Sequence, residues 1–236
     1  MIAAGLTKSQ INNAGRLVRR YLRGEIDGER VDRALDVIQE YRAAHQYPLI
    51  KANNGLPSVI LTTGCQIEVS QRLKRLNTIV DKLRRHPNMG LTTMQDIGGC
   101  RAVLKSIDEI RRVEHRLKKN RPVLADDDYV TRPRSSGYRS VHVIVGYDDE
   151  EGIQRAIEVQ LRTPQMHQWA IVVERLSGRL QVDLKSGFGP APVLAWLAKV
   201  SDAMAMDELG QDVPEPLLAE LENLRLAALP LVGGHL

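Results

Sequence analysis

Two carboxylates beside strand-like segments are the first candidates for chemistry in this sequence. Asp96 lies in MQDIGGCR, just before two glycines, where a carboxylate at a strand edge could hold a divalent cation close to the backbone. Glu158 lies in the alternating segment AIEVQLRT and shares one strand face with Gln160 and Arg162. From the residues alone, Asp96 fits a tight turn as well. The face of Glu158 equally fits a ladder of cross-strand charges or the floor of an active site.

Basic side chains precede and follow these carboxylates. Arg72, Lys74 and Lys82 occur in SQRLKRLNTIVDKLRRHP, where the two lysines are about two helical turns apart and could point the same way. A solvated basic helix face is the alternative. From Ser70 to His142 there are 17 basic and 8 acidic residues, a net charge of +9, whereas the rest of the chain is −5. The overall +4 therefore hides a basic centre whose positive field suits several phosphates.

An aromatic ring among cations follows in DDDYVTRPRSSGYRSVH. The pattern predicts a loop ending at Gly137 and a strand beginning at Tyr138, on which Tyr138, Ser140 and His142 share a face. A ring presented there could stack on a base while neighbouring arginines such as Arg134 meet phosphates. The acidic run 126–128 indicates a solvated turn rather than a metal site.

The elements that must position these residues combine two periodicities. Valine-rich or alternating runs predict strands at 99–104, 141–145 and 156–162, and helical spacing predicts a helix at 106–119 between the first two. Further helices are predicted near 7–22, 29–45, 163–176, 190–206 and 214–228, whereas the prolines and glycines of 47–64 indicate an irregular connection. We therefore expect an α/β (α+β) fold with a mixed sheet. The predicted organisation is an N-terminal helical extension at 1–64, a core at 65–189 and C-terminal helices at 190–236.

Composition excludes several classes of protein. The chain has 236 residues, 43% of them hydrophobic, which fits a soluble globular domain with its own core. Its two cysteines cannot build a disulfide framework or a four-cysteine zinc site. The polar N-terminus does not fit a signal peptide, and no apolar run approaches 18 residues, so we expect a cytoplasmic protein without a membrane span. With 4% aromatic residues, a stacking platform for single strands is not expected.

In order and together, four motifs resemble the synthetase domain of the RelA/SpoT family of alarmone synthetases. They are RLKRLNTIVDKL, MQDIGGCR, PRSSGYRSVH and EVQLRTPQMHQWA, and the resemblance covers about residues 70–185. It implies a mixed sheet related to the nucleotidyltransferase fold. It also implies an ATP:nucleotide pyrophosphotransferase that uses Mg²⁺ and transfers the β,γ-pyrophosphate of ATP to the 3′-hydroxyl of GDP or GTP, giving AMP and (p)ppGpp.

The resemblance also implies a role for each candidate residue. Arg72 and Arg101 would sandwich adenine, and Lys74 and Lys82 would bind the ATP phosphates with Thr78 near them. Asp96 and Glu158 would hold Mg²⁺, and Glu158 could also activate the 3′-hydroxyl. The residues implied for the acceptor nucleotide are Tyr138, stacking on guanine, and Arg134, His142, Gln160, Arg162 and His167 around it.

Departures from the family pattern leave alternatives open. No histidine is followed by aspartate, as the family's hydrolase domain would require, so a small synthetase-only type is expected. The loop carries Arg134 where lysine is common, and the segment after Trp169 lacks the usual Glu-His and Tyr-Lys pairs. Acceptor choice and oligomer contacts therefore stay open, although family members often form homo-oligomers through terminal helices.

Two other functions compete with guanosine-phosphate synthesis. A relative with another acceptor, an adenine nucleotide or the 3′ end of tRNA, would also use the +9 segment. A non-catalytic nucleotide or RNA sensor is the third hypothesis. The presence of both Asp96 and Glu158 argues against it, because a sensor needs no such pair of carboxylates.

Overall fold

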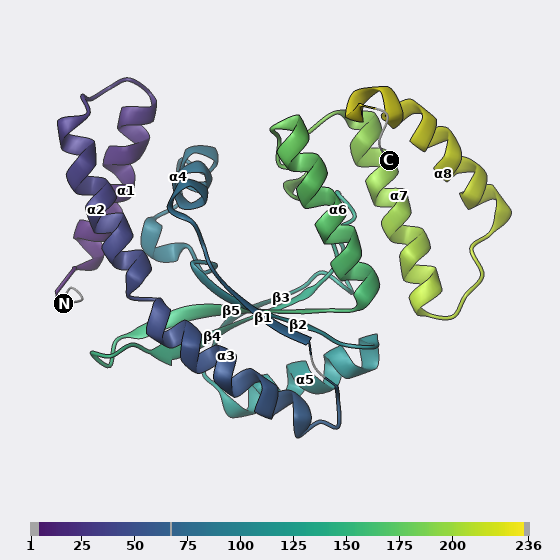
Figure 1. The fold of residues 1–236 in the computed structure, drawn as a ribbon, viewed down its shortest axis with the longest axis horizontal. Helices are drawn as coiled ribbons and strands as arrows, with labels where there is room; N and C mark the ends of the chain where they lie inside the picture. The colour runs from purple at the N-terminus through teal and green to yellow at the C-terminus, as the bar shows by residue number, and fades with distance from the viewer. Residues whose placement is uncertain (1–4, 67, 234–236) are drawn as a thin grey trace.

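A five-stranded mixed sheet forms the centre of the computed structural model, which describes residues 5–66 and 68–233 (Figure 1). The strand order is β1-β2-β5-β4-β3, in which β2 and β5 run parallel and the other neighbours antiparallel. The strands are β1 (Glu68–Leu73), β2 (Gly98–Val103), β3 (Val123–Asp128), β4 (Val141–Asp148) and β5 (Gln154–Arg162). The expected mixed sheet is therefore confirmed.

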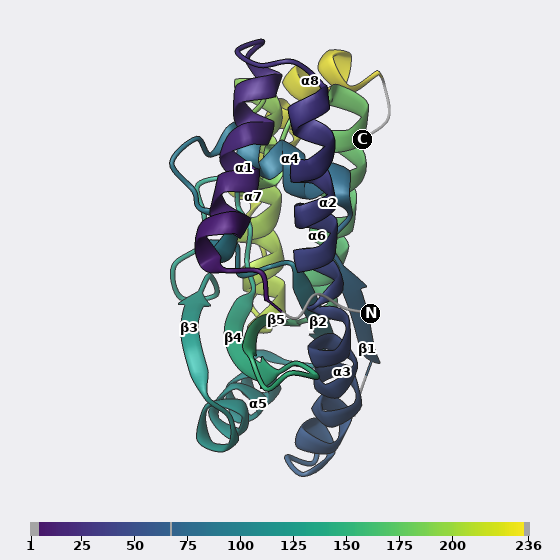
Figure 2. The ribbon, with the colours of Figure 1, turned by 90° about the vertical axis from the view of Figure 1, so that its left-hand side faces the viewer.

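Helices cover both faces of this sheet. On one face lie α3 (Gln46–Leu61) and α5 (Ile107–Asn120). On the other side are α1 (Lys8–Leu22), α2 (Glu29–Ala43), α4 (Leu76–Arg85), α6 (Pro164–Leu180), α7 (Ala191–Glu208) and α8 (Glu215–Ala228) (Figures 1 and 2). Three short 3₁₀ turns complete the chain: η1 (Leu91–Thr93), η2 (Leu184–Ser186) and η3 (Leu229–Val232).

Three apolar clusters define which sheet face is free for polar residues. The first lies between the sheet and α3 and α5, and it includes Ile157, Val159 and Leu161 of β5. The second joins α1, α2 and α4, and the third joins α6, α7 and η3. Because successive strand residues alternate, the other side chains of β5 face the region between the second and third clusters. The predicted alternation of β5 is confirmed.

The segment 47–64, predicted as an irregular connection, is mostly the helix α3. Its side chains Leu49, Ala52, Leu56 and Ile60 recur at helical spacing and are buried against the sheet. This burial outweighs the cost of Pro57 inside the helix. Pro48 lies in the first turn, where a missing N–H costs little.

Two edge strands carry no alternating apolar pattern, so the sequence pattern did not predict them. β1 and β3 are largely exposed and polar, as edge strands commonly are. The acidic run 126–128 therefore ends β3 and is not a turn, and Asp127 pairs with His142 of β4.

The predicted start of the first helix is confirmed. Thr7 forms a capping box with Gln10 at the start of α1, as expected.

His45, between α2 and α3, gives the fold a dependence on pH. The ring is 1% exposed, and its Nδ1 lies 2.9 Å from the carbonyl oxygen of Tyr41. Burial lowers the pKa of His45 to about 4. Because the unfolded chain then takes up this proton at higher pH than the folded one, stability should fall as the pH drops from about 6.5 to about 4, by up to about 3 kcal/mol.

Urea unfolding at about pH 7 and about pH 4.5 tests this expectation. His45→Gln can still donate to the carbonyl of Tyr41 but does not titrate, so it should lose less stability over this interval than the wild type does. Equal losses in the two proteins would contradict the assignment.

No helix within residues 5–66 and 68–233 is long and apolar enough to cross a bilayer.

The predicted boundaries between the N-terminal extension, the core and the C-terminal helices, at 64/65 and 189/190, stay predictions. Residues of α3 and of the sheet share one apolar cluster across the first of these boundaries.

Candidate active site

Strand register brings the polar residues of four strands to one sheet face, opposite α3 and α5. Arg101 of β2 pairs with Gln160 of β5, and His142 of β4 pairs with the same Gln160 from the other side. Glu158 lies two residues before Gln160, and Arg72 of β1 is the diagonal neighbour of Arg101. Directly paired residues and those two positions apart share a face, so these five side chains form one polar surface.

Glycines leave room on this surface. Gly99 pairs with Arg72 on one side and Glu158 on the other, and a Cβ there would lie 3.4 Å from the carbonyl oxygen of Glu158. On the opposite face, a Cβ at Gly98 would lie 2.7 Å from Cδ1 of Ile157. Gly98 therefore allows close packing against Ile157 on the sheet face that α3 and α5 cover. Gly99 leaves open space on the opposite, polar face.

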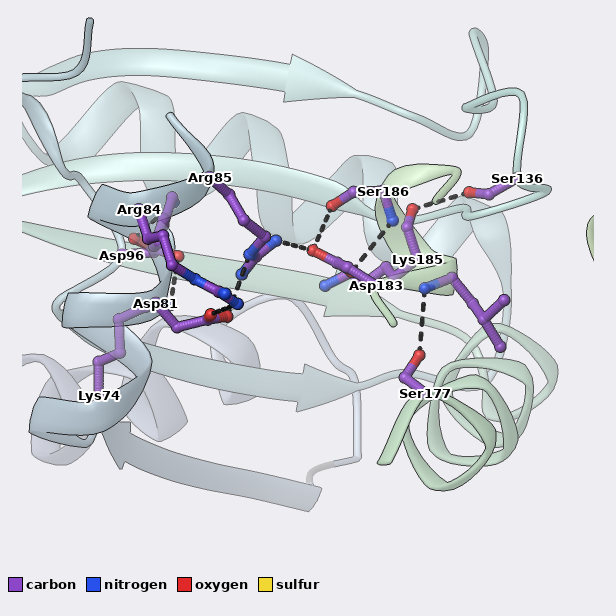
Figure 3. Close-up of polar contacts among 12 residues, drawn as sticks. Lys74, Asp81, Arg84, Arg85, Asp96, Ser136, Ser177, Asp183, Lys185 and Ser186 are labelled. Atoms are coloured by element: carbon purple, nitrogen blue, oxygen red, sulfur yellow. Dashed lines mark hydrogen bonds and ion pairs between the residues drawn. The ribbon is translucent and has the colours of Figure 1, made fainter. Parts of the chain in front are cut away.

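Asp96 accepts hydrogen bonds from two lysines at once. Nζ of Lys74, just after β1, lies 2.8 Å from Oδ2 (Figure 3). Nζ of Lys82 on α4 lies 2.9 Å from Oδ1. Burial opposes the charge of Asp96, but the two ammonium groups outweigh it and hold the pKa of Asp96 below its usual range. Thr78 lies one turn before Lys82 on α4. Both lysines reach Asp96, although Lys74 precedes α4 and does not share a helix with Lys82.

Five residues, Glu158 among them, form a closed ring of hydrogen bonds. His142 Nδ1 lies 2.9 Å from Glu158 Oε1, and His142 Nε2 lies 2.7 Å from the hydroxyl of Tyr138. Arg162 Nη2 donates to that hydroxyl at 2.9 Å and to Gln160 Oε1 at 2.8 Å, and Gln160 Nε2 donates to Glu158 Oε2 at 2.5 Å. The ring fixes the orientation of Glu158 without a ligand.

Charges in this ring stabilise one another. Burial disfavours ionisation of Glu158, but the hydrogen bond and charge of His142 overcome it and lower the pKa of Glu158 to about 2. Burial likewise opposes the charge of His142, but Tyr138 and Glu158 raise its pKa. Glu158 is therefore a carboxylate at neutral pH.

Tyr138 is fully buried in this structure, and its predicted role in stacking on guanine stays a prediction. The strand begins at Val141 and not at Tyr138. Gly137, with φ +88°, packs so closely on α7 that a Cβ would lie 2.8 Å from Cα of Ala198. This contact draws the ring of Tyr138 into the third apolar cluster, beside Trp169.

The remaining predicted residues lie at the rim of the same surface. Arg72 makes a long ion pair of 3.6 Å with Glu174 of α6, and both side chains are largely exposed. Arg134 is exposed, and it donates to the hydroxyl of Tyr129 at 2.7 Å. His167 on α6 has its pKa lowered by burial and by the charges of Arg101 and Arg162.

Lys185 and Tyr129 belong to this region, and sequence reasoning missed both. The ammonium of Lys185 lies 4.2 Å from the ring centroid of Tyr138, and the ring of Tyr129 lies 5.2 Å from that of His142. Lys185 comes from η2, far along the chain from the other cations. Neither residue has a spacing that singles it out in the sequence.

Asp96 and Glu158 have the donor chemistry that Mg²⁺ requires. The charge of Asp96 acts on the pKa of Glu158, so the two carboxylates are within electrostatic reach of each other. Among the described residues there is no cluster of three or more His, Cys, Asp or Glu side chains able to hold a metal alone. Mg²⁺ is commonly held by one or two carboxylates together with substrate phosphates, which these two residues fit.

A cavity of about 360 Å³ lies elsewhere, between the α2–α3 junction and the turn joining β4 to β5. Its lining includes Asp149, Glu150 and Glu151, and these carboxylates would repel a polyphosphate. The polar surface over β2 and β5 is therefore the better candidate for nucleotide chemistry.

Comparison with known proteins supports the polar surface over β2 and β5 as the candidate site. Residues 71–176, which include every predicted site residue, match the family described as "Region found in RelA / SpoT proteins". The chain is 32% identical over 159 residues to the GTP pyrophosphokinase YjbM of Bacillus subtilis, which covers 62% of this chain and 73% of that protein.

Two solved structures are similar along most of their length. Small alarmone synthetase 1 from Bacillus subtilis superposes with a TM-score of 0.63 and 26% identity, over 80% of this chain and 98% of that one. The same enzyme bound to its product pppGpp gives a TM-score of 0.65 at 23% identity, over 78% and 96% of the two chains. This likeness extends beyond residues 71–176 into the flanking helices.

Proposed function

Because the chain belongs to the RelA/SpoT synthetase family and is a homologue of GTP pyrophosphokinases, we propose that it is a (p)ppGpp synthetase. It would transfer the β,γ-pyrophosphate of ATP to the 3′-hydroxyl of GDP or GTP and release AMP. One observation carries the proposal. Two ionised carboxylates, Glu158 on β5 and Asp96 in the turn before β2, lie among cations that suit two nucleotides.

ATP would bind over β1, β2 and α4. Arg72 and Arg101 are diagonal neighbours on one face, an arrangement that supports stacking of adenine between their guanidinium groups. Lys74 and Lys82 would exchange Asp96 for ATP phosphates, with Thr78 beside them. That exchange replaces one charge-assisted contact by another and therefore costs little.

The acceptor 3′-oxygen would attack the β-phosphorus, and the bond from that phosphorus to the oxygen bridging to the α-phosphorus would break, leaving AMP. Catalysis of this kind is mainly positioning and neutralisation of charge. Asp96 and Glu158 would hold Mg²⁺, which neutralises the polyphosphate when bound. Glu158, oriented by His142 and Gln160, would accept the hydrogen bond of the 3′-hydroxyl and take its proton during transfer.

The acceptor nucleotide would lie on the side of β4 and α6. Guanine would stack on Tyr138 once the side chains over its ring move, because the ring is fully buried without a ligand. The groups proposed to surround the acceptor are Arg134, His142, Gln160, Arg162 and His167. Arg162 is buried with an unpartnered Nε, which supports an anion as its missing neighbour.

Two partner assignments belong to the same proposal. A homo-oligomer through the terminal helices is supported by the exposed Leu218 and Leu226 of α8. The positive charge of residues 70–142 supports tRNA as the alternative acceptor.

An acceptor screen tests the proposal. Purified protein is incubated with labelled ATP and Mg²⁺, in parallel with GDP, GTP, ADP or tRNA, and the products are separated by thin-layer chromatography. We expect AMP together with guanosine tetra- or pentaphosphate in the first two reactions. Turnover restricted to ADP or tRNA would assign the other acceptor, and absence of AMP in every reaction would contradict the proposed activity.

A further inference from the structure

The segment between α6 and α7, residues 181–190, joins the two halves of the site. Asp183 pairs with Arg85 of α4, the helix that carries Lys82, and Ser136 Oγ donates to the carbonyl oxygen of Lys185 at 2.8 Å (Figure 3). The buried Leu184 donates its backbone N–H to Ser177 Oγ at 3.2 Å. The segment is therefore fixed to α4, to the loop before Tyr138 and to α6.

These contacts place the ammonium of Lys185 over the ring of Tyr138, 4.2 Å from its centroid. The side chain is half-buried and makes no salt bridge with a carboxylate in the part of the chain that the structure describes. An ammonium group that lies on an aromatic ring without a counter-ion has lost part of its hydration and gained only a weak cation–π interaction. An anion within reach would be a stronger partner.

The neighbours of Lys185 make this surplus of positive charge larger. Arg162 lies 5.4 Å from the same ring centroid, and His142 bonds to the hydroxyl of Tyr138. Two cations, Lys185 and Arg162, and the imidazole of His142 thus surround the side chain of Tyr138.

We propose that Lys185 is a further acceptor-binding residue, whose ammonium leaves the ring of Tyr138 and pairs with a phosphate of an incoming nucleoside di- or triphosphate. The same movement uncovers the ring face that a base needs. Lys185 lies outside residues 71–176, the stretch that matches the family description. The inference rests on the proposed function and adds a specificity-determining residue from the C-terminal part of the chain.

Steady-state kinetics of Lys185→Met in the full chain tests this role. We expect the KM for GDP to rise about tenfold, with the KM for ATP changed by less than about twofold, because one charge-assisted contact to the acceptor is lost. Lys185→Arg should retain most of the acceptor affinity. Lys119→Met, an exposed lysine on α5 across the sheet, is the matched control and should change neither constant.

Calorimetric titration with GDP alone separates this inference from the proposed activity. Weaker GDP binding by Lys185→Met than by the wild type supports Lys185 even if no AMP is released, in which case the activity alone is contradicted. Equal binding by both proteins, or binding by neither, overturns the role of Lys185. Tighter binding by Lys185→Met also overturns it, since the lysine would then only obstruct the ring.

Asp183→Asn tests whether the pair with Arg85 positions Lys185. We expect a smaller rise in the KM for GDP than with Lys185→Met and no further rise when the two substitutions are combined, because both act through one contact. Additive effects would show that Asp183 acts independently of Lys185.

Discussion

Replacing Glu158 by glutamine should lower the rate of AMP release about 10² to 10⁴-fold, the range that a lost proton acceptor commonly produces. The amide keeps the size of the side chain but removes its charge and half of its acceptor capacity. The amide would accept the hydrogen bond and the proton of the 3′-hydroxyl less well than the carboxylate does, and it would bind Mg²⁺ only weakly. In this structure the carboxylate is oriented by His142 and Gln160, so the loss is of charge and not of position.

Stability measured beside activity separates these effects. Gln160 Nε2 donates to Glu158 at 2.5 Å, and an amide N–H in that place would face another donor, so we expect a loss of about 1–2 kcal/mol in unfolding free energy. Rates are therefore compared on protein shown to be folded by circular dichroism. Glu220→Gln, on the surface of α8, is the control. A folded Glu158→Gln variant with wild-type rate would refute the assigned role.

Replacing Asp96 by asparagine should separate ATP binding from catalysis. We expect the rate to fall on the order of 10²-fold, since a carboxylate that holds the metal is lost. Without Mg²⁺, however, ATP should bind about tenfold more tightly than to the wild type. Lys74 and Lys82 are paired with Asp96 in the ligand-free protein, and the substitution frees both while removing a negative charge that repels the polyphosphate.

Titration of ATP in EDTA and again in excess Mg²⁺ measures this separation. The wild type should gain more affinity from Mg²⁺ than Asp96→Asn does. Asp202→Asn, an exposed aspartate of α7, serves as the control and should match the wild type in both buffers. Weaker ATP binding by Asp96→Asn in EDTA, or an unchanged rate, would show that Asp96 has another task.

Some of the site follows from the sequence because strand periodicity is local. Alternation along β5 places Glu158, Gln160 and Arg162 on one face once Ile157, Val159 and Leu161 turn to the core. The four motifs indicated the family, and the comparisons confirm it. The roles of the individual residues stay predictions, because the resemblance assigns them.

Pairing across the chain follows no local pattern. Lys74 and Lys82 converge on Asp96 because of the way β1 and α4 pack beside β2. The spacing of the two lysines along the sequence indicated only that they could point the same way. The helix α3 was missed for a related reason. Burial of its apolar side against the sheet overrides the local cost of proline, and only the folded core supplies that burial.

The sequence by itself determined the basic centre, the mixed sheet and the polar face of β5, because net charge and side-chain periodicity are properties of the chain. Only the tertiary structure decided that Tyr138 is buried and that Lys185 lies on its ring. Both depend on contacts between the loop before β4 and elements more than forty residues later in the chain, at η2 and α7. Such contacts form because the third apolar cluster closes around them, and no local propensity specifies that closure.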